Sequence, residues 1–186
     1  MYYFLILLIF GFISNLASTS TAKFSEKWGK QTGTLVTIIL RDILGIPVWA
    51  IGFVLAIRES SEMLYHSSFL SQVIGWVIIT FGAIIIITAL VSIRTKAAAP
   101  STNDTFVKTG IYSMVRHPIH SGTFLEFIGL FILWPSLTVG IAVLLGFIWI
   151  HLQSRFEEKD LIKRIPEYKD YMIKIPRFIP GFQQKS

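Results

Sequence analysis

The sequence contains no cysteine and few charged residues. Without cysteine, the chain has no disulfide, no thiolate metal site and no cysteine nucleophile. Only 15% of the 186 residues are charged, whereas typical soluble domains have about 25%. In contrast, 53% are hydrophobic and the mean hydropathy is +0.62. The apolar residues form long blocks, which indicates helices that span a bilayer.

Five apolar blocks predict an all-α integral membrane protein with about five transmembrane helices. The first block lacks the positive segment of a secretory signal, so we expect it to be retained as a span. Trp134-Pro135-Ser136 divides the last block into two halves that are each barely long enough to cross. We therefore expect these halves to form a short helical hairpin. The blocks are residues 1–16, 34–57, 69–93 and the two halves of 121–150.

Three residues interrupt the second block. Arg41 and Asp42 are adjacent, and adjacent side chains do not face each other on a helix. We therefore interpret them as marking an interfacial entry rather than a buried ion pair. Pro47 is expected to kink the helix, because proline removes a backbone hydrogen bond and clashes with the preceding turn.

The basic residues predict the orientation of the chain. Fifteen of the 17 lysines and arginines fall in the first loop, the third loop and the C-terminal tail, which five crossings place on one face. The positive-inside rule makes this face cytoplasmic and the N-terminus external. The net charge of +6 is thereby explained by topology. We expect membrane lipids as neighbours and no nucleic-acid partner.

Two polar clusters flank the predicted hairpin. In the first, residues 110–120, Arg116 and His117 precede Pro118, which favours a helix start that can hold an anionic group. The alternative is an ordinary interfacial loop. The second, residues 151–161, is expected where the last helix leaves the membrane. Its glutamates are either a solvated face or a binding site for a ligand amine or hydroxyl.

Glu126 is a third candidate, because a carboxylate inside a spanning segment is costly and often functional. It either lines a cavity or lies buried beside His120 or His151. We expect no metal site, since the two acidic residues of the second cluster are adjacent and do not share a helix face.

Together, these residues resemble a known signature. The chain resembles the isoprenylcysteine carboxyl methyltransferase family and the related phospholipid methyltransferases, which are small helical membrane enzymes that use S-adenosyl-L-methionine. The resemblance runs from about Asp104 to Pro180. The matching residues, in order around the apolar hairpin, are Gly110, Tyr112, Arg116-His117-Pro118, Gly122, Glu157-Glu158, Leu161, Tyr168, Tyr171, Pro176, Arg177 and Pro180.

The polar residues and the resemblance together give candidate roles. His117, Glu126 and Arg155 are the candidates for catalysis. The implied cofactor-binding residues are Asp104, Thr105, Phe106, Val107, Gly110, Tyr112, Arg116, His117, Pro118, Ile119, His120, Glu157 and Glu158.

The chain departs from the family pattern at two positions. His120 replaces a usual tyrosine, and it can still stack and form hydrogen bonds. Gln153 stands where the carboxyl methyltransferases carry an arginine that engages substrate. Arg155 lies about 200° further around the helix. This change weakens the case for a carboxylate substrate more than the case for methyl transfer.

The sequence thus predicts N-terminal transmembrane helices over residues 1–96 and a methyltransferase-like region over residues 97–186. The expected activity transfers a methyl group to a carboxyl or amine of a lipidic or amphipathic substrate that enters from the bilayer. One alternative is an NADPH-dependent membrane reductase of the sterol-reductase type, which would need a larger basic pocket. The other is a non-enzymatic membrane adaptor.

Overall fold

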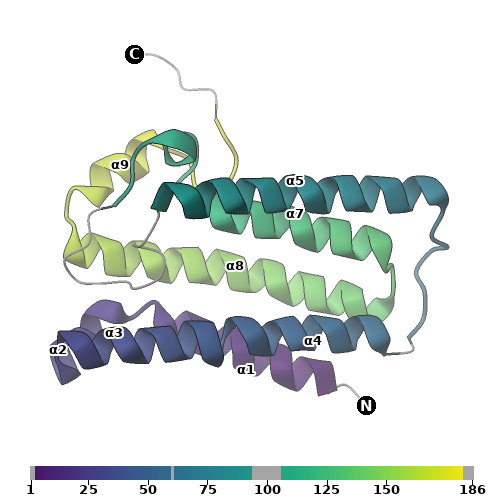
Figure 1. Ribbon diagram of the computed structural model, residues 1–186, viewed down its shortest axis with the longest axis horizontal. Coiled ribbons are helices and arrows are strands. Elements are labelled where there is room, and N and C mark those ends of the chain that lie inside the picture. The colour runs from purple at the N-terminus through teal and green to yellow at the C-terminus, as the bar shows by residue number, and fades with distance from the viewer. Residues whose placement is uncertain (1–2, 60, 94–105, 182–186) are drawn as a thin grey trace.

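The computed structural model describes residues 3–59, 61–93 and 106–181, and every regular element among them is a helix, as predicted. The helices run roughly along one axis and form an elongated bundle (Figure 1). The elements are α1 (Tyr3–Ser18), α2 (Thr21–Trp28), α3 (Lys30–Ile38), the π-helix η1 (Ile39–Ile43), α4 (Ile46–Arg58), α5 (Phe69–Ile93), the 3₁₀-helix η2 (Gly110–Ser113), α7 (Pro118–Leu133), α8 (Leu137–Arg164) and α9 (Tyr168–Lys174).

Three helical segments are long and apolar enough to cross a membrane. They are Lys30–Arg58, Phe69–Ile93 and Leu137–Arg164, and the pair α1–α2, bent by 66°, makes a fourth if it counts as one span. The prediction of about five spans is therefore supported for three or four. The predicted span that does not meet the length requirement is α7. Its 16 residues extend about 24 Å, less than the ~30 Å hydrocarbon core. The protein is a multi-pass membrane protein with α7 as a shorter apolar helix.

The predicted hairpin is present, with arms of unequal length. α7 begins with Pro118 in its first turn, where proline's missing N–H costs nothing. The chain turns at Trp134-Pro135, and the Ser136 side chain caps α8 by accepting a hydrogen bond from the Val139 N–H. α8 is 28 residues long and continues through the acidic cluster, as expected of a last helix that runs out of the membrane there. The second arm is thus not short.

The second apolar block breaks differently from the prediction. The chain forms a π-helix over Ile39–Ile43, and α4 begins at Ile46 with Pro47 in its first turn. Pro47 therefore starts a helix rather than kinking one. Arg41 and Asp42 do form an ion pair, with Nε to Oδ1 at 2.8 Å and Nη2 to Oδ2 at 2.9 Å. The expectation that the two side chains do not meet was wrong, because the long arginine side chain reaches its neighbour. The pair is partly exposed, so it is not a buried ion pair, as expected.

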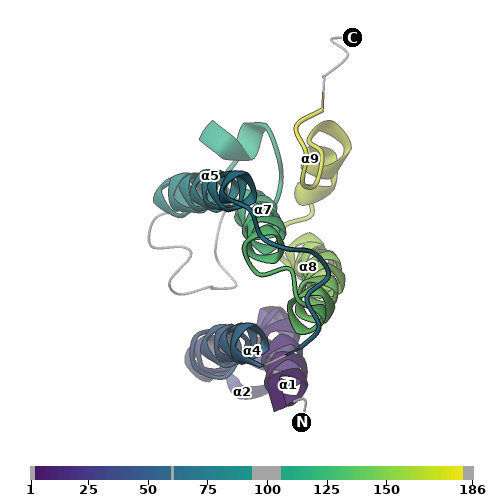
Figure 2. The same cartoon turned by 90° about the vertical axis from the view of Figure 1, so that its right-hand side faces the viewer.

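The core joins four of the helices. In Figure 2, α8 lies between the α5–α7 pair and the α1–α4 pair. Phe12 of α1 stacks on Trp149 of α8 with ring centroids 4.9 Å apart, and Phe53 of α4 stacks on Phe127 of α7 at 4.7 Å. The outward faces of α1 and α5 expose large apolar side chains such as Phe10, which suits contact with lipid.

Glycines bring α5 and α7 into close contact. A Cβ on Gly82 would lie 2.7 Å from the Gly122 carbonyl oxygen, and a Cβ on Gly129 would lie 2.8 Å from that of Gly75. Small residues allow helix backbones to approach closely in membranes. Gly75 and Gly82 therefore pack within the chain and hold α7 against the long span α5.

The ends of several helices meet at one end of the bundle, where α2, α3 and α9 lie in Figure 1. The Ala22 N–H of α2 donates to Asp160 of α8 at 3.1 Å, and Asp160 also accepts from Arg164 at 2.7 Å. The basic residues of α2, α8 and α9 thus share this end, whereas Arg58 ends α4 at the other. The position of these basic residues at one end agrees with the predicted topology. The assignment of this end to the cytoplasm stays a prediction.

Candidate functional site

A cavity of about 590 Å³ opens at the polar end of the bundle. Its size is in the range of small-molecule sites. Its walls come from α1, the η1–α4 segment, α5, η2 and its flanks, α7, α8 and α9. The lining residues are Asn15, Arg41, Asp42, Ile46, Trp49, Ile86, Leu90, Ile93, Phe106, Val107, Tyr112, Arg116, His117, Ile119, His120, Thr123, Glu126, Trp149, Gln153, Glu157, Leu161, Tyr168 and Tyr171.

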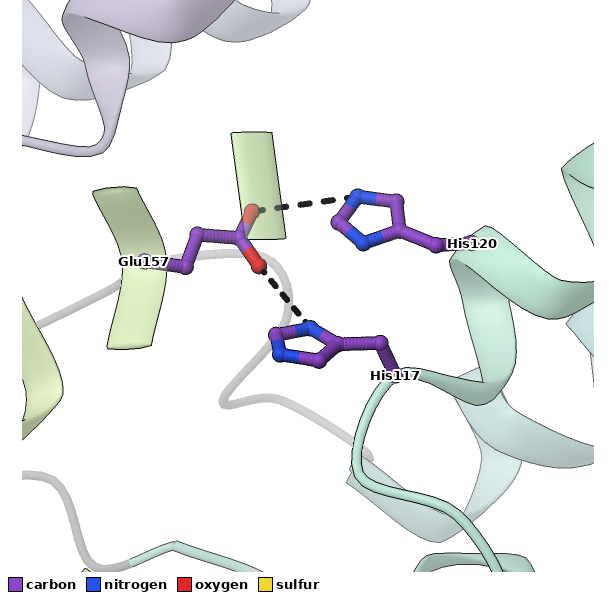
Figure 3. A group of neighbouring side chains, drawn as sticks. All are labelled: His117, His120 and Glu157. Atoms are coloured by element: carbon purple, nitrogen blue, oxygen red, sulfur yellow. Dashed lines mark ion pairs between the residues drawn. The ribbon is translucent and has the colours of Figure 1, made fainter. Parts of the chain in front are cut away.

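Glu157 brings α7 and α8 together at the centre of this site. Figure 3 shows its carboxylate pointing toward the rings of His117 and His120, with one oxygen directed at each. One carboxylate oxygen lies 3.4 Å from His117 Nδ1 and the other lies 4.0 Å from His120 Nε2. The Glu157 side chain is 34% exposed, whereas both histidines are buried. The carboxylate is therefore accessible from the cavity, while its histidine partners form the wall behind it.

Glu158 points to a different environment and binds three cationic or imidazole groups. It accepts from Arg116 Nε at 3.1 Å and from Arg177 Nη2 at 2.6 Å, and His117 Nε2 lies 3.1 Å away. Arg116 also donates to the carbonyls of Met172 and Ile175. Glu158 is only 3% exposed, so it joins α8 to the residues before α7 and after α9 instead of facing a ligand.

The two glutamates control the charge of His117, which directly precedes α7. Burial is the largest influence and lowers its pKa, but the hydrogen bonds and charges of Glu157 and Glu158 together raise the pKa above its ordinary value. The imidazolium form of His117 is thus stabilised between two carboxylates. A protonated His117 holds both acidic side chains in place.

Aromatic side chains form another wall. Phe106 lies with its ring centroid 5.1 Å from those of Tyr168 and Tyr171. Burial raises the pKa of Tyr171 to about 12, against the opposing charge of Arg116. Burial also raises the pKa of Tyr112 and of Tyr168, and nearby carboxylates add to the effect. These phenols remain neutral, and that of Tyr171 donates to the Tyr112 carbonyl.

Four buried polar atoms of the cavity wall have no hydrogen-bond partner among the residues that the structure describes. They are Trp49 Nε1, His120 Nδ1, Trp149 Nε1 and Gln153 Oε1. The amide nitrogen of Gln153, in contrast, donates to Glu157 at 3.1 Å. Because unsatisfied buried polar groups are costly, their gathering around one cavity indicates a site built for a polar ligand.

The structure brings most of the sequence-predicted residues to the cavity. Gly110, Pro118 and Glu158 do not line it, and Arg155 is exposed on another face of α8. Asp104 and Thr105 lie outside the described residues. Those that line the cavity are Phe106, Val107, Tyr112, Arg116, His117, Ile119, His120, Glu126 and Glu157.

Sequence reasoning missed the contribution of the N-terminal helices. Arg41 and Asp42 carried a signal as charges inside an apolar block, but Asn15 and Trp49 carried none. Tyr168 and Tyr171 belonged to the matched signature without being assigned to the site. Gln153 was noted only as a departure from the family pattern.

The fold and this cavity define a multi-pass membrane protein with a polar site at one end of its helices. The phospholipid methyltransferase family model matches residues 70–168. These are more than half of the chain, so the protein belongs to this family of methyltransferases. The match includes α5, α7 and α8 and ends at Tyr168, so it contains His117, His120 and Glu157 but not the N-terminal helices.

Two curated proteins are similar over a shorter stretch. The nickel-cobalt-cadmium resistance protein NccN of Alcaligenes xylosoxydans xylosoxydans is 35% identical over 75 residues, which are 40% of this chain and 35% of that protein. The cobalt-zinc-cadmium resistance protein CzcN of Cupriavidus metallidurans is 33% identical over 79 residues, 42% of this chain and 37% of that protein. The matches thus span little more than a third of these relatives. No solved structure gives a significant match.

Proposed function

We propose that the chain is an S-adenosylmethionine-dependent methyltransferase that acts on a lipidic or amphipathic substrate. The observation that carries the proposal is the accessible carboxylate of Glu157 in a cavity whose wall holds unsatisfied polar atoms. Family membership makes methyl transfer the reaction class. The resemblance in sequence assigns cofactor contacts to the same side of the cavity.

The residues present fit S-adenosylmethionine. Its amino-acid end carries an ammonium and a carboxylate, and its sulfur is positively charged. Glu157 and Gln153 Oε1 offer acceptors for an ammonium or hydroxyl group, and Trp149 Nε1 offers a donor. The faces of Phe106 and Tyr168 favour a nearby cation. When bound, the cofactor supplies an activated methyl group.

The residues of the chain then have two tasks. They must align the donor with the acceptor, because an activated leaving group needs little further chemistry. They must also accept a proton if the acceptor is an amine, whereas a carboxylate acceptor needs no base. Glu126 lines the same cavity from α7 and is the carboxylate that we assign to this proton.

The substrate is proposed to reach the cavity from the bilayer. Ile86, Leu90 and Ile93 of α5 line the wall that continues into the lipid-exposed face of this helix, and Leu90 is itself partly exposed. The ion pair of Arg41 and Asp42 lies on the π-helix of the same cavity, and π-helical turns are frequent at functional sites. We assign this pair to the polar group of the substrate. The cofactor enters from the polar end, which we place in the cytoplasm.

A nicotinamide cofactor fits the site less well. Its phosphates require several cationic donors. Among the described residues, the arginines that line the cavity are Arg41 and Arg116, and each already binds a carboxylate. This arrangement favours a methyl donor over NADPH.

The test is calorimetric binding of S-adenosylmethionine and of NADPH to the detergent-purified chain. We expect micromolar binding of the methyl donor that is lost or strongly weakened in Glu157→Ala and retained in Arg155→Ala, a matched control on the exposed side of α8. Binding of NADPH, or of neither ligand by a folded protein, would overturn the proposal.

Both similar proteins are named as metal resistance proteins, which favours a second candidate role, in resistance to transition metals. The test is growth of a metal-sensitive host on cobalt or nickel with the intact chain and with Glu157→Ala. Growth with the intact chain but not with Glu157→Ala would support this role. Equal growth of the hosts that carry the intact chain and the Glu157→Ala variant would count against it.

A further inference from the structure

Three side chains of the site offer a set of ligand atoms for a metal ion. One atom each from His117, His120 and Glu157 lies within 4.8 Å of the other two (Figure 3). Ligands of a tetrahedral zinc-type ion, with bonds of about 2.0–2.2 Å, are roughly 3.4 Å apart. The observed separations from Glu157 are 3.4 Å to His117 Nδ1 and 4.0 Å to His120 Nε2. Small shifts of the His120 ring and the half-exposed Glu157 side chain would complete the set.

The surroundings of His117 suit a metal ligand. Metal-binding histidines usually donate their second ring N–H to a carboxylate, which fixes the tautomer and orients the ring. His117 Nε2 lies 3.1 Å from Glu158 Oε1, which leaves Nδ1 facing Glu157 and His120. A metal ion bound at Nδ1 displaces the proton that this nitrogen carries in the imidazolium form, and the proton is released to solvent. Arg116 and Arg177 hold Glu158 in place from other segments. The orienting carboxylate is therefore itself fixed.

The second histidine is also poised for binding. His120 lies in the first turn of α7, three residues after His117, and their rings stack with centroids 5.3 Å apart. Its Nδ1 is buried without a partner among the described residues, so no hydrogen bond there dictates its tautomer. Nε2 can then present its lone pair toward Glu157. Beyond these ligands lies the cavity, which leaves a further coordination position open.

We propose that His117, His120 and Glu157 bind one divalent transition metal ion. Imidazole and carboxylate together suit zinc, cobalt or nickel, whereas magnesium and calcium prefer oxygen ligands alone. From the sequence we expected no metal site, because we considered Glu157 and Glu158 together as the acidic ligands. In the structure only Glu157 joins the set, and the second imidazole comes from the next turn of the chain.

Metal and methyl donor exclude each other in this scheme. This part rests on the proposed function, because it uses the assignment of Glu157 to the cofactor. A carboxylate that coordinates an ion cannot also accept hydrogen bonds from a ligand ammonium in the same position. The metal would thus act as a competitive inhibitor of cofactor binding.

The first experiment is a Co²⁺ titration of the detergent-purified, metal-stripped full chain, without methyl donor, followed by the visible absorption of bound Co²⁺. We expect a single ion per chain with nitrogen ligation, and at least tenfold weaker binding in His120→Gln and in Glu157→Gln. His151→Gln is the matched control, because it removes an exposed histidine of α8 outside the cluster. Thermal unfolding establishes that each variant is folded.

The outcomes separate the two proposals. A folded chain that fails to bind Co²⁺, or whose affinity is unchanged in both folded ligand variants, overturns the metal site whether or not it binds S-adenosylmethionine. Binding of Co²⁺ without binding of the methyl donor would support the metal site and overturn the proposed function. If both bind, we expect Co²⁺ to raise the apparent Kd of the donor, and simultaneous binding would overturn the exclusion.

Discussion

Glu157 and Glu158 are neighbours in the chain, yet their carboxylates lie on opposite sides of the His117 ring. Glu157 approaches Nδ1 from the cavity, and Glu158 approaches Nε2 from the protein interior. The two acidic side chains therefore have different tasks. One faces the cavity, and the other joins three segments of the chain.

The first prediction follows from this division. Glu158→Gln leaves the buried Arg116 guanidinium without its counter-charge, and breaking a buried ion pair costs about 3–5 kcal/mol. We expect a marked fall in the thermal unfolding midpoint in detergent. Glu157→Gln, at the partly exposed neighbour, is the control and should lower the midpoint much less. Equal losses in the two variants would contradict the division of roles.

The second prediction concerns pH. The pKa of His117 is raised in the folded protein, so its protonated form contributes stability that is fully present below its unfolded pKa of about 6.5. This contribution is lost as the pH rises through the higher, folded pKa. We expect the unfolding midpoint to fall over this interval, and to fall less steeply in His117→Gln. Parallel pH profiles of the two proteins would show that His117 is not the responsible group.

The third prediction tests the contact between α5 and α7. A Cβ on Gly82 would lie 2.7 Å from the Gly122 carbonyl, a backbone atom that cannot move alone. Gly82→Ala should destabilise the protein by about 1–3 kcal/mol, as overpacking does, despite the better helix propensity of alanine. Gly140→Ala gains the same propensity and meets only the edge of the Phe131 ring at 3.3 Å. Its unfolding midpoint should stay above that of Gly82→Ala, and the reverse order would contradict the tight contact.

The fourth prediction concerns Gln153. Its amide nitrogen donates to Glu157, and losing one such hydrogen bond costs about 0.5–1.5 kcal/mol, or a factor of roughly 2–13 in affinity. Calorimetry should therefore show weaker binding of S-adenosylmethionine to Gln153→Ala. A donor affinity that falls in Arg155→Ala and not in Gln153→Ala would place the cofactor on the other face of α8.

Much of the polar side of the cavity could be predicted from sequence, because its residues form a dense polar signature beside an apolar hairpin. His117 and Glu157 were predicted for this reason. The different role of Glu158 could not be, since adjacent residues on a helix end look alike until the partners of each are known. Those partners, Arg116 and Arg177, lie 42 and 19 residues away along the chain.

The membrane side was harder to predict. Apolar blocks indicate where helices lie, and α5 agrees with its predicted range of 69–93. They do not indicate which faces line a cavity, so Trp49 and Trp149 could not be distinguished from lipid-facing or core residues. The π-helix at Arg41 also had no signal in residue periodicity. Both features depend on how distant helices pack.

The hydrogen bonds between the chain beyond α9 and the start of α7 have a consequence for biosynthesis. The Arg116 and His117 N–H groups donate to the carbonyls of Pro176 and Arg177, and Ser121 donates to Phe178. A ribosome completes α5, α7 and α8 before it reaches these partners. The start of α7 therefore lacks these hydrogen-bond partners until residues 176–178 have been synthesised and have folded back onto it.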